Sequence, residues 1–229
     1  DKFEITSLRK DIKTDGRHAK VIFSSDWKED ASRRDFTINS IYSDISGNLF
    51  DPFEGKKDLE FGKIRFVGDP HKRIKEDYLR VLRYIRFFIN YSKLPHSEEV
   101  KKAIKQNIKG VSSISSERLL DEFKKLIYSK NFLNLFKDDF SLEIINLIFP
   151  QFKNLTIFKA LNNFAAKKLV EVDYIFLISL LILDETDNVD YFLYKFNISK
   201  NDKKRVLFLK NFYKNNLNEN AFSEKNLFK

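Results

Sequence analysis

The chain has 229 residues, of which 42% are hydrophobic and 15% aromatic, enough for a sizeable core and for two or three small domains. Its 42 Lys and Arg residues outnumber its 33 Asp and Glu residues, and the resulting charge of +9 favours a polyanionic partner. The lack of cysteine excludes disulfides and thiolate metal sites, and no apolar run is long enough to span a bilayer.

The first third of the chain mixes short strand patterns with one helix pattern. Residues 1–9 and 20–25 predict two strands, and a polar loop at 11–19 joins them. Residues 29–42 predict a helix, because its acidic first turn suits the positive end of a helix dipole. A turn, a Gly-containing segment and a short strand at 64–67 follow.

The start of the chain is unusual. The sequence opens at Asp1 in what reads as the middle of a strand, and it contains no methionine. We therefore expect it to be the remainder of a longer protein. No signal peptide is visible, which predicts a cytoplasmic protein.

The most informative pattern lies between residues 70 and 89. Pro70 is typical of a helix start, so we expect one long helix from this point. One arc of that helix is apolar and predicts a core-facing stripe, made of Tyr78, Val81, Leu82, Ile85, Phe88 and Ile89. The opposite side carries a polar ridge at steps of three residues, made of Asp77, Arg80, Arg83 and Arg86.

All cations of this ridge are arginines, whose planar fork pairs with phosphates, carboxylates and base edges. Asp77 and Arg80, one turn apart, present an acceptor beside a pair of donors. Cytosine and adenine carry an exocyclic amine next to an acceptor nitrogen, whereas uracil and guanine carry a carbonyl and an N–H. The pair therefore predicts acceptance of CTP and ATP and rejection of UTP and GTP.

Further along the ridge, Arg83 and Arg86 would reach the triphosphate or the incoming RNA end. The alternative interpretation is an exposed ridge of helical ion pairs that binds no ligand.

Beyond residue 97 the pattern is helix after helix, with Lys-rich polar faces. The predicted spans are 97–109, 115–129, 131–148, 155–169, 171–184, 188–196 and 199–216.

A second polar cluster follows two adjacent cations, Arg33 and Arg34. We expect Asp35 to accept from a ribose hydroxyl, Arg34 to hold a phosphate, and Asn39 to do either. The alternative is a charge cluster that merely begins a helix. Glu4, on the first strand, either faces solvent or serves as one ligand of a divalent cation, which it cannot hold alone.

Several motifs occur in order along residues 1 to about 129. They are FEITSLR from residue 3, RRDFTIN from residue 33, DPFEGxxDL from residue 51, RFVGDPxxRIxEDYLR from residue 65, and SxER ending at residue 118. Their order and spacing resemble the class II nucleotidyltransferases, namely bacterial tRNA CCA-adding enzymes and the related poly(A) polymerases. The last hundred residues resemble this family's helical body and tail only in general character.

The resemblance implies an α+β fold, with the remainder of a nucleotidyltransferase head (mixed sheet plus helices) followed by an all-α neck, body and tail. The implied boundaries are 1–68 for the head or palm, 69–129 for the neck that selects the base, and 130–229 for the RNA-binding body and tail. The implied function is addition of CMP and AMP, from CTP and ATP with Mg²⁺, to the 3′ end of tRNA.

The resemblance also implies residue roles. Arg34 and Asp35 hold the ribose and phosphates, Asp77 and Arg80 form the protein's template for the base, and Arg83 and Arg86 assist them. Glu4 corresponds to a third active-site carboxylate and to a metal ligand. The segment from Arg9 to Ala19 resembles a loop that resets specificity from C to A.

The sequence departs from the family at its start. It has neither the Gly-Gly turn nor the Asp-x-Asp strand that holds two Mg²⁺ ions, so we expect this chain alone to be inactive. Two alternatives stay open: a poly(A) or A-adding enzyme of the same family, and a non-catalytic RNA- or nucleotide-binding chain. Oligomeric state and the residues that contact tRNA cannot be read from the sequence.

Overall fold

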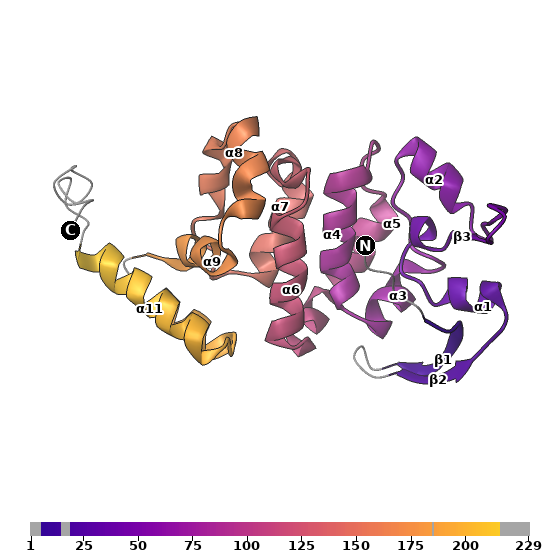
Figure 1. The fold of residues 1–229 in the computed structure, drawn as a ribbon, viewed down its shortest axis with the longest axis horizontal. Helices are drawn as coiled ribbons and strands as arrows, with labels where there is room; N and C mark the ends of the chain where they lie inside the picture. Colours follow the sequence, from indigo (N-terminus) through magenta and orange to yellow (C-terminus); the bar gives the residue numbers. More distant parts are fainter. Residues whose placement is uncertain (1–5, 15–18, 185, 216–229) are drawn as a thin grey trace. The chain divides into compact units, whose positions relative to one another are not determined.

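The computed structural model describes residues 6–14, 19–184 and 186–215, and it divides the chain into two compact units (Figure 1). Unit 1 is Asp1–Ser115 and unit 2 is Ser116–Lys229. The predicted fold class is confirmed, because strands and helices mix in unit 1 whereas the described part of unit 2 is helical. No described helix is long and apolar enough to cross a membrane.

The strands of unit 1 form two antiparallel pairs. These are β1 (Arg9–Thr14) with β2 (Ala19–Phe23), and β3 (Tyr42–Ser43) with β4 (Leu49–Phe50). The predicted loop at 11–19 is wrong in its first half, which belongs to β1. This segment is too polar to read as a strand alone, but its backbone pairs with the more apolar β2. The first five residues of the strand predicted at 1–9 lie outside the described residues.

The single helix predicted at 29–42 is wrong. Helix α1 spans only Trp27–Ser32, and a short 3₁₀ turn, η1, spans Thr37–Asn39. Between them Phe36 is extended, with φ −120° and ψ 150°, and forms an isolated β-bridge with Phe66. Pairing with a distant segment thus overrides the local helix pattern. The strand predicted around Phe66 is reduced to this bridge.

Helix α2 (Gly55–Phe61) packs closely against the η1 turn. A Cβ added to Gly55 would lie 2.1 Å from the Thr37 carbonyl oxygen, so only glycine allows this approach. Asp58 of α2 is buried, and its Oδ2 accepts from Thr37 Oγ1 at 2.6 Å and from Arg65 Nε at 2.9 Å. These contacts fix the position of the segment that carries Asp35.

The long helix predicted from Pro70 is two helices, α3 (Pro70–Glu76) and α4 (Leu79–Tyr91). Asp77 interrupts them with an extended backbone (φ −154°, ψ 105°), and its Oδ1 accepts from the Leu79 backbone N–H at 3.1 Å. Asp favours such capping positions over helix interiors, which explains the break. The apolar stripe is confirmed, and its buried members include Val81, Leu82, Ile85 and Ile89.

The core of unit 1 forms where α4 meets the Phe36–Phe66 bridge. The stacked rings of Phe66 and Tyr84 lie 5.7 Å apart, and the Phe36 ring lies 4.9 Å from that of Phe66. All three side chains are at most 1% exposed. Helix α5 (Glu98–Asn107) packs against α3, and the 3₁₀ segment η2 (Ile108–Ser113) ends the unit.

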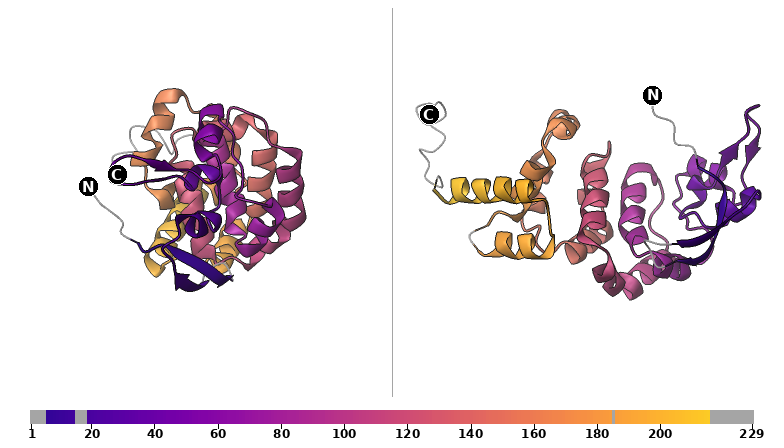
Figure 2. Two further views of the ribbon diagram at one scale, coloured as in Figure 1. Left: turned by 90° about the vertical axis from the view of Figure 1, so that its right-hand side faces the viewer. Right: turned by 60° about the horizontal axis from the view of Figure 1, so that its bottom comes forward.

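The described part of unit 2 is a succession of helices, as predicted (Figures 1 and 2). The α-helices are α6 (Ser116–Ile127), α7 (Asp139–Ile148), α8 (Asn163–Lys168), α9 (Tyr174–Ile182), α10 (Asn188–Lys195) and α11 (Lys200–Asn215). The 3₁₀ segments are η3 (Phe132–Lys137), η4 (Leu155–Ala160) and η5 (Leu169–Glu171). Thus the spans predicted at 131–148 and 155–169 are each divided. An aromatic core holds the unit together, with Phe123 lying 4.7 Å from Phe152.

Candidate nucleotide-binding site

Polar and charged residues from two separate segments of the sequence meet in unit 1, and they include several of the predicted site residues. The end of α1 and the η1 turn lie against the junction of α3 and α4, and ion pairs and hydrogen bonds join the two sides. The side chains that take part are Asp30, Arg33, Arg34, Asp35, Asn39, Arg73, Glu76, Arg80 and Arg83. Arginines outnumber carboxylates in this group, so the surface favours an anion.

Asp35 joins the two segments directly. Arg83 Nε donates to Asp35 Oδ2 at 2.7 Å across 48 residues of sequence, and Asn39 Nδ2 donates to Asp35 Oδ1 at 2.9 Å. Burial raises the pKa of the Asp35 carboxyl, but the Arg83 charge and these hydrogen bonds hold it below its ordinary value. Three predicted site residues therefore lie together around one ionised carboxylate.

The Arg80 guanidinium donates hydrogen bonds to three acceptors in the chain. Its Nη1 donates to the Arg73 carbonyl at 2.8 Å and to Glu76 Oε2 at 2.6 Å, and its Nη2 donates to the Arg33 carbonyl at 3.2 Å. Only 13% of the Arg80 side chain is exposed. Arg80 therefore stabilises the α3–α4 junction. It lies in the first turn of α4, where its backbone N–H donates to the carbonyl of Asp77, the other half of the predicted base template, at 3.0 Å.

Arg73 supports the same region and was missed by the sequence interpretation. It is 8% exposed, pairs with Glu76, and donates through Nη2 to the Arg34 carbonyl. Arg73 and Arg80 thus hold the backbone carbonyls of two adjacent residues, Arg33 and Arg34. The only signal in the sequence was the RIxED motif that contains Arg73.

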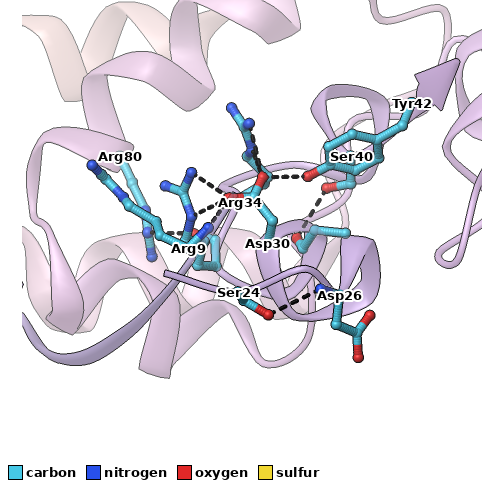
Figure 3. A network of polar contacts seen from close by, with 10 residues as sticks. Arg9, Ser24, Asp26, Asp30, Arg34, Ser40, Tyr42 and Arg80 are labelled. Carbon is cyan, nitrogen blue, oxygen red and sulfur yellow. Dashed lines mark hydrogen bonds and ion pairs between the residues drawn. The ribbon is translucent and has the colours of Figure 1, made fainter. Parts of the chain in front are cut away.

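Asp30 is the most heavily bonded carboxylate among the residues described in this site (Figure 3). Its Oδ2 accepts from Tyr42 Oη at 2.6 Å and from Arg34 Nη2 at 2.9 Å. Its Oδ1 accepts from Arg33 Nη2 at 2.6 Å and from the Arg9 backbone N–H at 3.2 Å. Burial raises the pKa of Asp30, but these bonds, led by that from Tyr42, lower it to about 2.

The sequence interpretation assigned Asp30 only a helix-dipole role. The missed signal was spacing, because Arg33 and Arg34 follow Asp30 by three and four residues, which places both on its side of a helical turn. Tyr42, which donates to Asp30 from the β3 strand at 2.6 Å, carried no comparable signal.

Arg86 lies farther along α4. Its guanidinium carbon is 4.7 Å from the centre of the Phe87 ring, and its backbone carbonyl accepts from Asn90 Nδ2 at 2.7 Å. Arg83 also approaches the Phe87 ring, at 5.8 Å. The two arginines thus flank one aromatic side chain, and the predicted ridge continues along α4.

The described residues do not fit a divalent metal site. They contain no group of three His, Asp or Glu side chains that could hold an ion. Asp30 and Asp35 are already paired with guanidinium groups, which compete with a cation for the same oxygens. Glu4, the one predicted metal ligand, lies outside the described residues. Chemically, the arrangement offers guanidinium donors suited to an anion beside polar side chains suited to a hydrogen-bonding partner.

Comparison with protein families gives two matches. Residues 1–65 match a family described as "Poly A polymerase head domain". Residues 97–156 match one described as "Probable RNA and SrmB- binding site of polymerase A". The site described above lies in the first match and in the segment that separates the two.

Similar proteins have related names. The mouse protein "CCA tRNA nucleotidyltransferase 1, mitochondrial" is 39% identical over 216 residues, covering 91% of this chain and 48% of the mouse protein. The "CCA-adding enzyme" of Staphylococcus haemolyticus is 35% identical over 208 residues, covering 89% and 49%. The chain thus spans about half the length of these curated relatives.

A solved structure shares the fold. The Bacillus stearothermophilus CCA-adding enzyme in complex with CTP superimposes with a TM-score of 0.63, covering 97% of this chain and 54% of the other. At 23% identity this similarity supports the fold alone.

Proposed function

The chain belongs to the family of nucleotidyltransferases that includes poly(A) polymerases and CCA-adding enzymes, and from this premise we propose that it selects CTP and ATP for addition to the 3′ end of tRNA. The observation that carries the proposal is the cluster in which α1 and η1 are joined to the α3–α4 junction. It combines a polar pair suited to a base with arginines suited to phosphates.

Base selection rests on Asp77 and Arg80. A carboxylate accepts from the exocyclic amine of cytosine or adenine, and a guanidinium donates to the adjacent ring nitrogen. Arg80 already uses donors to hold the Arg33 and Arg73 carbonyls, which fixes its orientation before a base arrives. Such pre-organisation lowers the entropy lost on binding.

Ribose and phosphate recognition rests on Arg34, Asp35 and Asn39. Arg34 bonds Asp30 through Nε and Nη2, so its remaining edge is directed away from this carboxylate and is suited to a phosphate. A ribose hydroxyl that reached Asp35 would share its oxygens with Arg83 and Asn39. Arg83 and Arg86 extend the positive surface along α4 toward the triphosphate or the RNA end.

Divalent metal ions are general in this family, and we propose that the ion is Mg²⁺, which when bound would supply positive charge to the triphosphate and the RNA hydroxyl. The described residues of this chain do not provide its ligands. We therefore assign no catalytic step of this chain to a metal ion, and the role of Glu4 stays a prediction. A non-catalytic chain that binds RNA or nucleotides stays the second candidate function.

Three further assignments stay predictions. The segments 1–68, 69–129 and 130–229 would serve as head, neck, and body with tail. Addition of A alone, as in a poly(A) enzyme, uses the same Asp77 and Arg80 template and therefore stays an alternative. The cytoplasmic location also stays a prediction, since the mouse relative is named mitochondrial.

The test is competition among the four nucleoside triphosphates for this chain. CTP and ATP should displace a labelled CTP with similar constants, and UTP and GTP should do so at least about tenfold more weakly. Equal displacement by all four would contradict base selection. A chain that binds none of them, but binds tRNA, would favour the RNA-binding alternative.

A further inference from the structure

We propose that Asp30 is a positioning residue, whose buried carboxylate aligns the guanidinium groups of Arg33 and Arg34 so that Arg34 faces the nucleotide phosphates. The inference rests on the proposed function and deepens it, because it assigns to Asp30 the placement of a phosphate-binding group. Figure 3 shows Asp30, Arg34 and Tyr42 within one network of polar contacts.

The geometry of the contact carries the argument. Arg34 approaches Asp30 Oδ2 side-on, with Nε at 3.2 Å and Nη2 at 2.9 Å. A guanidinium is planar, so a side-on contact through one edge fixes the direction of the opposite edge. Arg33 makes a similar contact to the other oxygen, with Nε at 2.8 Å and Nη2 at 2.6 Å.

The two arginines differ in exposure. The Arg34 side chain is 38% exposed and the Arg33 side chain 18%, whereas that of Asp30 is 1% exposed. Asp30 is therefore covered by its partners, and Arg34 is the partner that reaches solvent. A ligand that approaches this end of α1 would meet the outer edge of Arg34 first.

The carboxylate itself is held independently of the arginines. Tyr42 Oη and the Arg9 backbone N–H donate to Oδ2 and Oδ1, so each oxygen also has a donor from another element. The Tyr42 ring additionally lies 5.9 Å from the Arg34 guanidinium carbon. The Asp30 carboxylate is thus held in a fixed orientation, and the guanidinium groups of Arg33 and Arg34 pair with it in defined orientations.

The experiment measures the dissociation constants of CTP and cytidine for the whole chain. Their ratio, here called the phosphate preference, reports contacts made to the phosphates alone. Asp30→Asn keeps the shape of the side chain but removes its charge. It should lower the phosphate preference by about tenfold, because an unanchored Arg34 loses a well-oriented, charge-assisted contact. Cytidine affinity should change little.

A merely structural role would lower the affinity for both ligands together, so two comparisons separate the cases. Arg34→Ala should lower the phosphate preference, and adding Asp30→Asn to it should cause no further loss, because Asp30 acts through Arg34. Asp26→Asn is the matched control, since Asp26 caps the same helix, is exposed, and bonds the Lys28 backbone N–H instead. It should leave the preference unchanged.

The outcomes are distinguishable. If Arg34→Ala lowers the preference but Asp30→Asn does not, or if the two losses add in full, the inference about Asp30 is wrong and the proposed function stands. If the unaltered chain does not prefer CTP to cytidine, or Arg34→Ala has no effect, the phosphate part of the proposed function fails, and the inference with it.

A second variant covers the case in which Asp30→Asn does not fold. The pair Asp30→Asn and Arg33→Gln removes one charge of each sign, and it is compared with Arg33→Gln alone. The pair should show a phosphate preference lower by about tenfold than the single variant. Equal preferences in these two proteins would overturn the inference.

Discussion

Asp77 and Arg80 both hold the α3–α4 junction through hydrogen bonds. Arg80 holds two backbone carbonyls and Glu76, so Arg80→Ala would leave buried acceptors unpaired and lower the stability of unit 1 together with any base contact. Asp77 bonds the Leu79 backbone N–H through one oxygen. Its exchange for asparagine keeps an oxygen for that bond, so Asp77→Asn tests the template with the cap on α4 retained.

Asp77→Asn should change nucleotide preference with little effect on folding. The new amide offers a donor where the carboxylate offered an acceptor, so it suits the carbonyl of uracil better than the amine of cytosine. The affinity for CTP relative to UTP should fall by about tenfold or more, since paired base contacts contribute ~1–3 kcal/mol. Competition binding and thermal melting of the same variant test this. An unchanged preference with a lowered melting temperature would identify a structural ion-pair ridge instead.

Asp30 should make the fold acid-sensitive. Its pKa falls from the ordinary 3.8 to about 2 in the folded chain, so its charged form stabilises the fold at pH values above 3.8. That contribution, of order 2 kcal/mol, should be lost as the pH falls from about 4 toward 2. Urea unfolding of the unaltered chain and of Asp30→Asn measures it. A stability difference between them that is constant across this range would contradict the prediction.

Local patterns predicted some of these residues and not others, for a physical reason. Arg34, Asp35, Asn39, Arg80 and Arg83 were predicted because their side-chain types and spacings suit a nucleotide. The pairing of Arg83 with Asp35, and of Arg73 with the Arg34 carbonyl, joins residues 48 and 39 positions apart. Periodicity within one helix carries no information about such partners, so the internal contacts were not predicted.

At the scale of elements, the apolar stripe of α4 and most helices of unit 2 were predicted because a buried face imposes its spacing on the sequence. The breaks at Phe36 and Asp77 were not predicted. Each depends on a backbone partner, the Phe66 bridge in one case and the cap on α4 in the other. Helical periodicity continues across both positions, so the sequence pattern alone could not locate them.

Gly55→Ala should damage the site from a distance. The new Cβ would lie 2.1 Å from the Thr37 carbonyl oxygen, so α2 and the η1 turn must separate. Because η1 carries Asn39 and begins two residues after Asp35, CTP affinity should fall together with stability, the latter by about 1–3 kcal/mol. Chemical unfolding and CTP binding measure the two effects.

Gly47→Ala is the matched control for that prediction. Gly47 has a φ of +85° but no neighbouring atom within 4 Å of an added Cβ, so its substitution introduces only backbone strain, costing about 1 kcal/mol. It should leave CTP affinity unchanged. If both alanine variants lower CTP affinity equally, close packing of α2 on η1 is not what positions the site.

At the scale of the whole molecule, the charge of +9 should govern RNA binding. Binding of a tRNA lacking its CCA end should weaken at least about tenfold between roughly 50 and 200 mM salt, because each phosphate contact releases condensed counterions. An RNA of unrelated sequence and similar size should show a similar slope. Filter binding across a salt series tests this, and affinity that does not depend on salt would remove the positive surface from the proposed function.

The backbone carbonyls of Arg33 and Arg34 accept hydrogen bonds from the side chains of Arg80 and Arg73, respectively. This has a consequence for motion. In the same region, the backbone N–H of Thr37 donates to the Arg65 carbonyl and that of Val67 donates to the Asp35 carbonyl, both at 3.0 Å. All four bonds join residues 33–37 to residues 65–80, so we expect this part of unit 1 to exchange its amide hydrogens with solvent as one cooperative unit. Thr37 and Val67 should then exchange at a common rate, and CTP should slow both, which would make the nucleotide part of the local fold.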